Sequence, residues 1–158
     1  MYRFGEGDLA RLAIGLADVE RAAKVIAGRL PRTPSLAAPE LSALTGADVV
    51  VKYETFHITG SFKERGALVR LSALDATERK RGVVTMSAGN HAQAVARHAT
   101  LLGVPATIVM PEATPMVKVE NTARHGARVV LAGETLSDSQ HEAERIVAAE
   151  GRILVHPY

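Results

Sequence analysis

Two segments of the chain combine residue types that could carry out chemistry, and the first contains Lys63. It reads Thr59-Gly-Ser-Phe-Lys63-Glu-Arg-Gly66. Gly60 permits a tight turn and Ser61 is a good N-cap, so we expect Lys63 in the first turn of a helix. The positive end of the helix dipole disfavours an ammonium group there. A Schiff-base lysine needs a neutral amine, and this is our hypothesis for Lys63; a solvated lysine at a helix start is the alternative that this segment leaves open.

The second segment is Ser87-Ala88-Gly89-Asn90-His91, where a predicted strand leads into a predicted helix. Free N–H groups at such a turn can bind an anion, for example a carboxylate or a phosphate, and the side chains of Asn90 and His91 add further donors. Ordinary helix capping by Ser87 or Asn90, and a packed rather than catalytic His91, are the structural alternatives.

Alternating strands and helices are expected to position both segments. Short apolar runs predict strands at 49–53, 83–86, 106–110, 128–131 and 153–155. Helical spacing and helix-ending residues predict helices at 17–30, 39–44, 61–74, 90–102, 115–125 and 136–150. This order predicts an α/β fold with an open parallel sheet flanked by helices. Such sheets bind ligands where strand ends lead into helices, which is where both segments lie.

Composition excludes several classes of function. The chain has no cysteine, which excludes disulfides, thiol catalysis and Cys-type zinc sites, and we expect no metal site in it. Its net charge is only +2, and bases are interleaved with acids, so we expect no nucleic-acid partner. No segment approaches the roughly 20 apolar residues that cross a bilayer, and the N-terminus lacks a signal-peptide pattern. We therefore expect a soluble, cytoplasmic protein without a membrane partner.

Together, the two segments resemble the fold type II pyridoxal phosphate (PLP) enzymes, and within them most closely the threonine/serine dehydratases. Other matching stretches are Arg32-Thr-Pro34, Lys52-Tyr-Glu54, Gly82-Val-Val, Val109-Met-Pro111, Lys118-Val, Gly126-Ala and His156-Pro-Tyr158. The resemblance leaves residues 1–16 as an unmatched leader. It implies that residues 17–50 belong to the larger lobe of such an enzyme, and residues 51–158 to the smaller α/β lobe and the start of the return to the larger one.

The resemblance also implies a role for each matching residue. Lys63 would hold PLP as a Schiff base and later move the proton at the substrate α-carbon. Phe62 would pack beside the pyridine ring, and Asn90 would hydrogen-bond the ring 3′-oxygen. The residues implied to bind the carboxylate of an amino-acid substrate are Ser87, Ala88, Gly89, Asn90 and His91. The cofactor would supply the carbanion chemistry, and the protein orientation and electrostatics.

The implied reaction is β-elimination, in which a hydroxy amino acid is dehydrated and deaminated. L-Threonine would give 2-oxobutanoate and ammonia, and L-serine would also react. Serine racemases of this family carry a serine as a second acid/base at the position of Ala88, and alanine cannot donate a proton, which disfavours racemisation. Thr55-Phe-His57 stands where the family commonly has Asn-Leu-Gln, so a hydroxyaspartate dehydratase stays open.

By the same resemblance, the glycine-rich loop that binds the cofactor phosphate, and the serine that faces the pyridine nitrogen, lie beyond the matching region. We therefore expect the chain to be part of a longer enzyme, binding PLP weakly and catalysing little or nothing alone. A non-catalytic α/β fragment is the alternative reading. Large-lobe surface left bare in residues 1–40 would favour self-association, so we expect a homo-oligomer.

Overall fold

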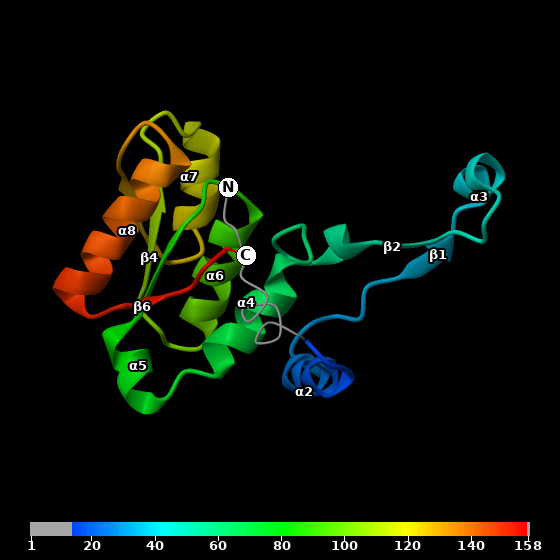
Figure 1. Cartoon of the computed structure of the whole chain (residues 1–158), viewed down its shortest axis with the longest axis horizontal. Coiled ribbons are helices and arrows are strands. Elements are labelled where there is room, and N and C mark those ends of the chain that lie inside the picture. The colour runs from blue at the N-terminus through cyan, green and yellow to red at the C-terminus, as the bar shows by residue number, and fades with distance from the viewer. Residues whose placement is uncertain (1–13, 158) are drawn as a thin grey trace, which may run out of the picture.

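The computed structural model describes residues 14–157 and contains a four-stranded parallel sheet, on the left in Figure 1. Its strands are β3 (Val83–Met86), β4 (Ala106–Met110), β5 (Arg128–Leu131) and β6 (Ile153–Leu154), in the spatial order β5-β4-β3-β6. Every residue of β3 and β4 is buried. Such continuous burial is what helices on both faces of a parallel sheet produce.

Helices cover the two faces of this sheet. On one side lie α6 (Asn90–Leu101) and α7 (Met116–Ala123), with α4 (Lys63–Ser72) packed on α6, and on the other lies α8 (Leu136–Glu150) (Figure 1). Successive residues of β4 point to opposite faces. Ile108 joins the cluster that contains Val95 of α6, and Val109 joins the one that contains Ile146 of α8. We call residues 63–157 the lobe.

Residues 14–53 form a separate feature that we call the arm. It contains α2 (Leu16–Ile26), β1 (Ser35–Ala37), α3 (Pro39–Thr45) and β2 (Val50–Lys52), and none of these four elements has a buried residue. Helix α2 packs beside α4, whereas β1, β2 and α3 extend away from the lobe (Figure 1). A single 3-10 turn, η1 (Glu54–Phe56), leads from the arm toward α4.

The α/β class with its flanked parallel sheet is confirmed, but the expected strand at 49–53 was misplaced. Its structured part, β2, lies outside the parallel sheet and pairs antiparallel with β1, with Ser35 opposite Lys52. An apolar run predicts a strand without identifying its partner, and β1 is too short to give a period of its own. The sequence interpretation also missed α5 (Ala76–Arg81), although Asp75 and Glu78 form the capping box that begins it.

Residues 1–13 of the expected leader 1–16, and Tyr158, lie outside the described residues. The proposed division at residue 50 stays a prediction. None of the helices in the described range has both the length and the apolar character to cross a lipid bilayer.

Candidate functional site

Lys63 is the first residue of α4, and its side chain enters a pocket of about 490 Å³. The amine Nζ donates a hydrogen bond of 2.7 Å to the carbonyl oxygen of Pro157, which follows β6. It also lies 5.6 Å from the centre of the Phe62 ring. The residues that line the pocket are Phe62, Lys63, Gly66, Ala67, Arg70, His91, Leu154, Val155, His156 and Pro157. The pocket thus lies between the start of α4 and the segment that follows β6.

The turn before α4 forms largely as the sequence predicts. Gly60 has φ +70°, which makes the tight turn possible, and Lys63 occupies the first helical turn. The helix begins two residues later than predicted, at Lys63. Phe62 takes the N-cap position without a side-chain cap, and Ser61 only receives a long contact of 3.4 Å from the Lys63 N–H to its Oγ. The backbone of Phe62 is already close to helical, so the Lys63 N–H to Ser61 Oγ contact is of the kind that an N-cap side chain makes, although the regular helix begins only at Lys63.

The second segment lies at the junction between β3 and α6, as predicted. Two of its N–H groups are engaged within the protein: that of Ser87 donates to Val109 O at 3.0 Å, and that of Gly89 to Ser87 Oγ at 3.2 Å. Helix α6 begins at Asn90, so the N–H groups of its first turn lack intrahelical acceptors. Anion binding at this turn thus has fewer available donors than expected.

The structure brings only some of the predicted site residues together. Phe62, Lys63 and His91 share the pocket, whereas Ser87, Ala88, Gly89 and Asn90 are not among the described residues that line it. Phe62 exposes 61% of its surface, so its ring is available to a ligand.

His91 is a packed side chain in this structure, 9% exposed. Its Nε2 lies 3.1 Å from Thr85 Oγ1 and 3.4 Å from the carbonyl oxygen of Val155. Burial lowers the pKa of His91, the Val155 carbonyl opposes this shift, and the nearby charges of Lys63 and His156 add to it. The imidazole is therefore neutral near physiological pH, and it joins α6 to β3 and to the segment after β6.

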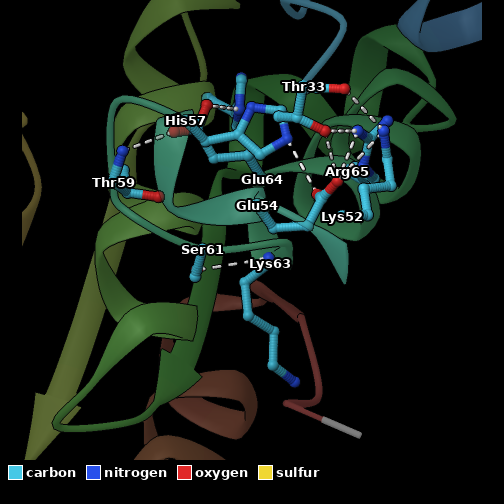
Figure 2. Close-up of polar contacts among 10 residues, drawn as sticks. Thr33, Lys52, Glu54, His57, Thr59, Ser61, Lys63, Glu64 and Arg65 are labelled. Carbon is cyan, nitrogen blue, oxygen red and sulfur yellow. Dashed lines mark hydrogen bonds and ion pairs between the residues drawn. The ribbon is translucent and has the colours of Figure 1, made fainter. Parts of the chain in front are cut away.

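A polar network fixes the chain between the arm and α4 (Figure 2). Glu54 accepts two hydrogen bonds from Arg65, at 2.7 and 2.9 Å, and one from Thr33 Oγ1 at 2.7 Å. Its Oε2 also lies 3.0 Å from His57 Nε2. The Arg65 guanidinium is the main reason that the pKa of Glu54 is lowered to about 2. Figure 2 shows Lys63 extending away from this network.

The sequence predicted only some of the basic side chains that line the pocket. Arg70 and His156 line it beside Lys63, and no described lining residue is acidic. Sequence reasoning missed Arg70, although residues at i and i+7 lie on one face of a helix. An amine, an exposed aromatic ring and further basic groups suit an anionic aromatic aldehyde, so the residues present fit PLP. Within residues 14–157, no group of three or more His, Asp or Glu side chains is placed to hold a metal ion.

Comparisons with known proteins agree with this geometry. The model of the family described as "Pyridoxal-phosphate dependent enzyme" matches residues 26–158. An L-threonine ammonia-lyase of Thermotoga maritima is 42% identical over 145 residues, which cover 92% of this chain and 36% of that protein. Among solved structures, maize serine racemase has a TM-score of 0.85 at 36% identity, covering 92% of this chain and 44% of that one.

A further solved structure, the processed form of threonine deaminase isoform 2 from Solanum lycopersicum, has a TM-score of 0.81 at 32% identity. It covers 98% of this chain and 41% of the other. The chain thus spans about two fifths of the length of the curated relatives that it matches, 36% and 42% for two of them.

Proposed function

Because this chain belongs to the family of pyridoxal-phosphate dependent enzymes, we propose that it forms part of an ammonia-lyase that dehydrates and deaminates hydroxy amino acids. L-Threonine, giving 2-oxobutanoate and ammonia, is the proposed main substrate, and L-serine a second one. The observation that carries the proposal is the amine of Lys63, presented at a helix start inside a basic pocket beside an exposed aromatic ring. The relatives named threonine ammonia-lyase and threonine dehydratase support the choice of substrate.

The protein's own residues have distinct parts in this proposal. PLP, when bound, supplies the electron sink for a carbanion at the substrate α-carbon. Lys63 would hold the cofactor and move the α-proton, Phe62 would pack on the cofactor ring, and Asn90 would hydrogen-bond its 3′-oxygen. Residues 87–91 would bind the substrate carboxylate, with the N–H groups of the first turn of α6, which begins at Asn90, as the main donors. Arg70 adds positive charge that favours an anionic ligand, and His156 adds a side chain that can form hydrogen bonds.

Single residues of this chain bear on two alternative activities of the same family. The high structural similarity to serine racemase favours racemisation, but Ala88 has no group that could donate a proton to the second face of a substrate. His57 favours a hydroxyaspartate dehydratase only if its ring reaches the substrate. Instead it is buried against Glu54, 3% exposed, which favours threonine and serine.

The chain on its own is proposed to be inactive and to self-associate through the apolar surface of its arm. We also propose a cytoplasmic location. We expect no measurable 2-oxo acid release from residues 1–158 with L-threonine, and sedimentation faster than a monomer at micromolar concentration. Robust turnover, or a compact monomer, would contradict these two expectations respectively.

Trapping the lysine tests the central assignment. The purified protein is incubated with PLP, reduced with borohydride, digested, and the modified lysine located by mass spectrometry. We expect the label on Lys63, its loss in Lys63→Ala, and no change in Lys24→Ala, a matched exposed lysine on α2. A label confined to any other lysine overturns the proposal.

A further inference from the structure

The side chain next to Lys63 points in the opposite direction, into the protein. Glu64 is 1% exposed, and it is the most deeply buried carboxylate in the described part of the chain. Its α4 neighbours on the same face are Ala67, Leu68 and Leu71, all buried and apolar. A charged side chain on such a stripe is costly to bury unless every charge finds a partner. The partners of Glu64 therefore indicate what it is for.

One carboxylate oxygen of Glu64 fixes the loop that precedes Lys63. Oε1 accepts a hydrogen bond of 2.6 Å from the backbone N–H of Thr59. This short, charge-assisted contact crosses the Gly60 turn, so it connects the start of α4 to the chain that leads into it. The Thr59 and Glu64 contact thereby sets the conformation of the residues between them, which end at Lys63.

The other carboxylate oxygen connects α4 to α6. Oε2 lies 3.0 Å from Nε2 of His98, which is 2% exposed, and 3.6 Å from Nε of Arg97. Helix α6 is the element that begins with Asn90 and His91. Burial lowers the pKa of His98. Burial by itself would raise the pKa of Glu64, but its contacts with Thr59, His98 and Arg97 outweigh burial and hold that pKa below its usual range. Glu64 is thus an ionised carboxylate hydrogen-bonded on both oxygens.

We propose that Glu64 is a positioning residue: by binding the Thr59 N–H and His98 at once, it holds the Lys63 segment in register with the Asn90–His91 end of α6. This inference rests on the proposed role of Lys63. A lysine that reacts with a cofactor carbonyl must approach it at a fixed distance and angle, and small displacements slow such reactions strongly. The Glu64 contacts limit the movement of α4 relative to α6 and of the loop relative to both.

If Glu64 only stabilised the fold, its replacement would have a different effect from the one that a positioning role predicts. Removing one partner of a buried charge pair leaves the other groups without their acceptor, and this generally destabilises the fold as a whole. If Glu64 served stability alone, its apolar variant would change the thermal midpoint without a selective effect on the loop. A positioning role requires a local effect at Thr59–Lys63 that exceeds any effect on the rest of the lobe.

Hydrogen exchange and lysine trapping on the purified protein distinguish these roles. In Glu64→Leu we expect amide exchange at Thr59 to rise about tenfold to a hundredfold, as loss of a charge-assisted hydrogen bond implies. Exchange in β4 should stay unchanged, and the rate of PLP attachment to Lys63 should fall at least severalfold. Glu64→Gln keeps an acceptor for Thr59 and should lie between Glu64→Leu and the unaltered protein. The matched control Leu71→Ala, on the same face of α4, should lower the thermal midpoint without selective exchange at Thr59.

Three outcomes overturn the inference. The first is that the amide exchange rate of Thr59 is unchanged in Glu64→Leu. The second is that both Glu64 variants lose protection from exchange equally at Thr59 and in β4. The third is that PLP attaches to Lys63 of Glu64→Leu at the rate of the unaltered protein. If the unaltered protein carries no label on Lys63, the proposed function fails first. The exchange experiment still decides whether Glu64 fixes the loop.

Discussion

The lobe and the arm are built from similar residues but differ in what surrounds them. Ile108 in β4 of the lobe is 0% exposed, whereas Leu44 in α3 of the arm is 83% exposed. The lobe surrounds its strands with helices on both faces, while β1, β2 and α3 rest mainly on their own hydrogen bonds. Burial within the chain therefore stabilises the lobe, and the arm gains little from it. Apolar surface exposed on this scale is typical of a surface that contacts other protein.

The largest expected effect is a difference in core truncation between the two regions. Ile108→Ala removes a fully buried side chain and should cost about 2 to 5 kcal/mol of unfolding free energy. At concentrations where the chain is monomeric, Leu44→Ala should cost less than about 0.5 kcal/mol, because little contact within the chain is lost. Urea unfolding of both variants and of the unaltered protein measures the difference. Equal losses would mean that α3 is covered in solution, for example in an oligomer, and dilution would then separate them.

Replacing one glycine in each region compares how closely the backbone is packed in the lobe and in the arm. Gly82 in the lobe has φ +79°, and a Cβ there would lie 2.5 Å from the carbonyl oxygen of Pro105. Gly46 in the arm has φ +70° with nothing within 4 Å of such a Cβ. Gly82 also has ψ −179°, a combination that is almost confined to glycine, whereas Gly46 is left-handed helical. Gly82→Ala should therefore cost about 2 to 3 kcal/mol, combining backbone strain with a clash, and Gly46→Ala about 1 kcal/mol from left-handed strain alone. Thermal unfolding should rank the variants in that order.

The smallest expected effect lies where the regions join. The pKa of Glu54 is lowered to about 2, so its contribution to stability is complete above its ordinary pKa of 4.5 and is lost as the pH falls from there toward 2. Glu54→Gln should lower the unfolding free energy at neutral pH by about 1 kcal/mol and flatten its decline over that pH range. Denaturant titrations at several pH values test this. An unchanged slope would mean that other carboxylates, such as Glu64, dominate acid unfolding.

The two regions also differ in how far the sequence could predict them. Strands and helices of the lobe follow from local periodicity, and the Gly60 turn places Lys63 by rules that act over a few residues. In the arm, β1 has three residues and its partner β2 lies beyond an intervening helix, so no local pattern identifies the pair. The confirmed parts of the fold are those determined by interactions between residues that are close together in the sequence.

The site divides in the same way. The segment of Lys63 and the segment of Asn90 were located from sequence, but the Lys63 contact with Pro157 spans 94 residues and that between Arg65 and Thr33 spans 32. Only a tertiary structure can show such contacts. Glu64 was within reach of sequence reasoning, because its spacing from Ala67, Leu68 and Leu71 puts a charge on the buried face of α4.

The position of β6 has a consequence for how the protein forms during synthesis. Strands β3, β4 and β5 lie in sequence order across the sheet, so each can pair with the one before it as the chain leaves the ribosome. Strand β6 is made last of the four and must return to the far side of β3. The residues after it supply the wall against which Lys63 is held. Translation must therefore pass residue 157 before the pocket can form. A cofactor that binds in this pocket would bind only to chains in which β6 has already joined the sheet.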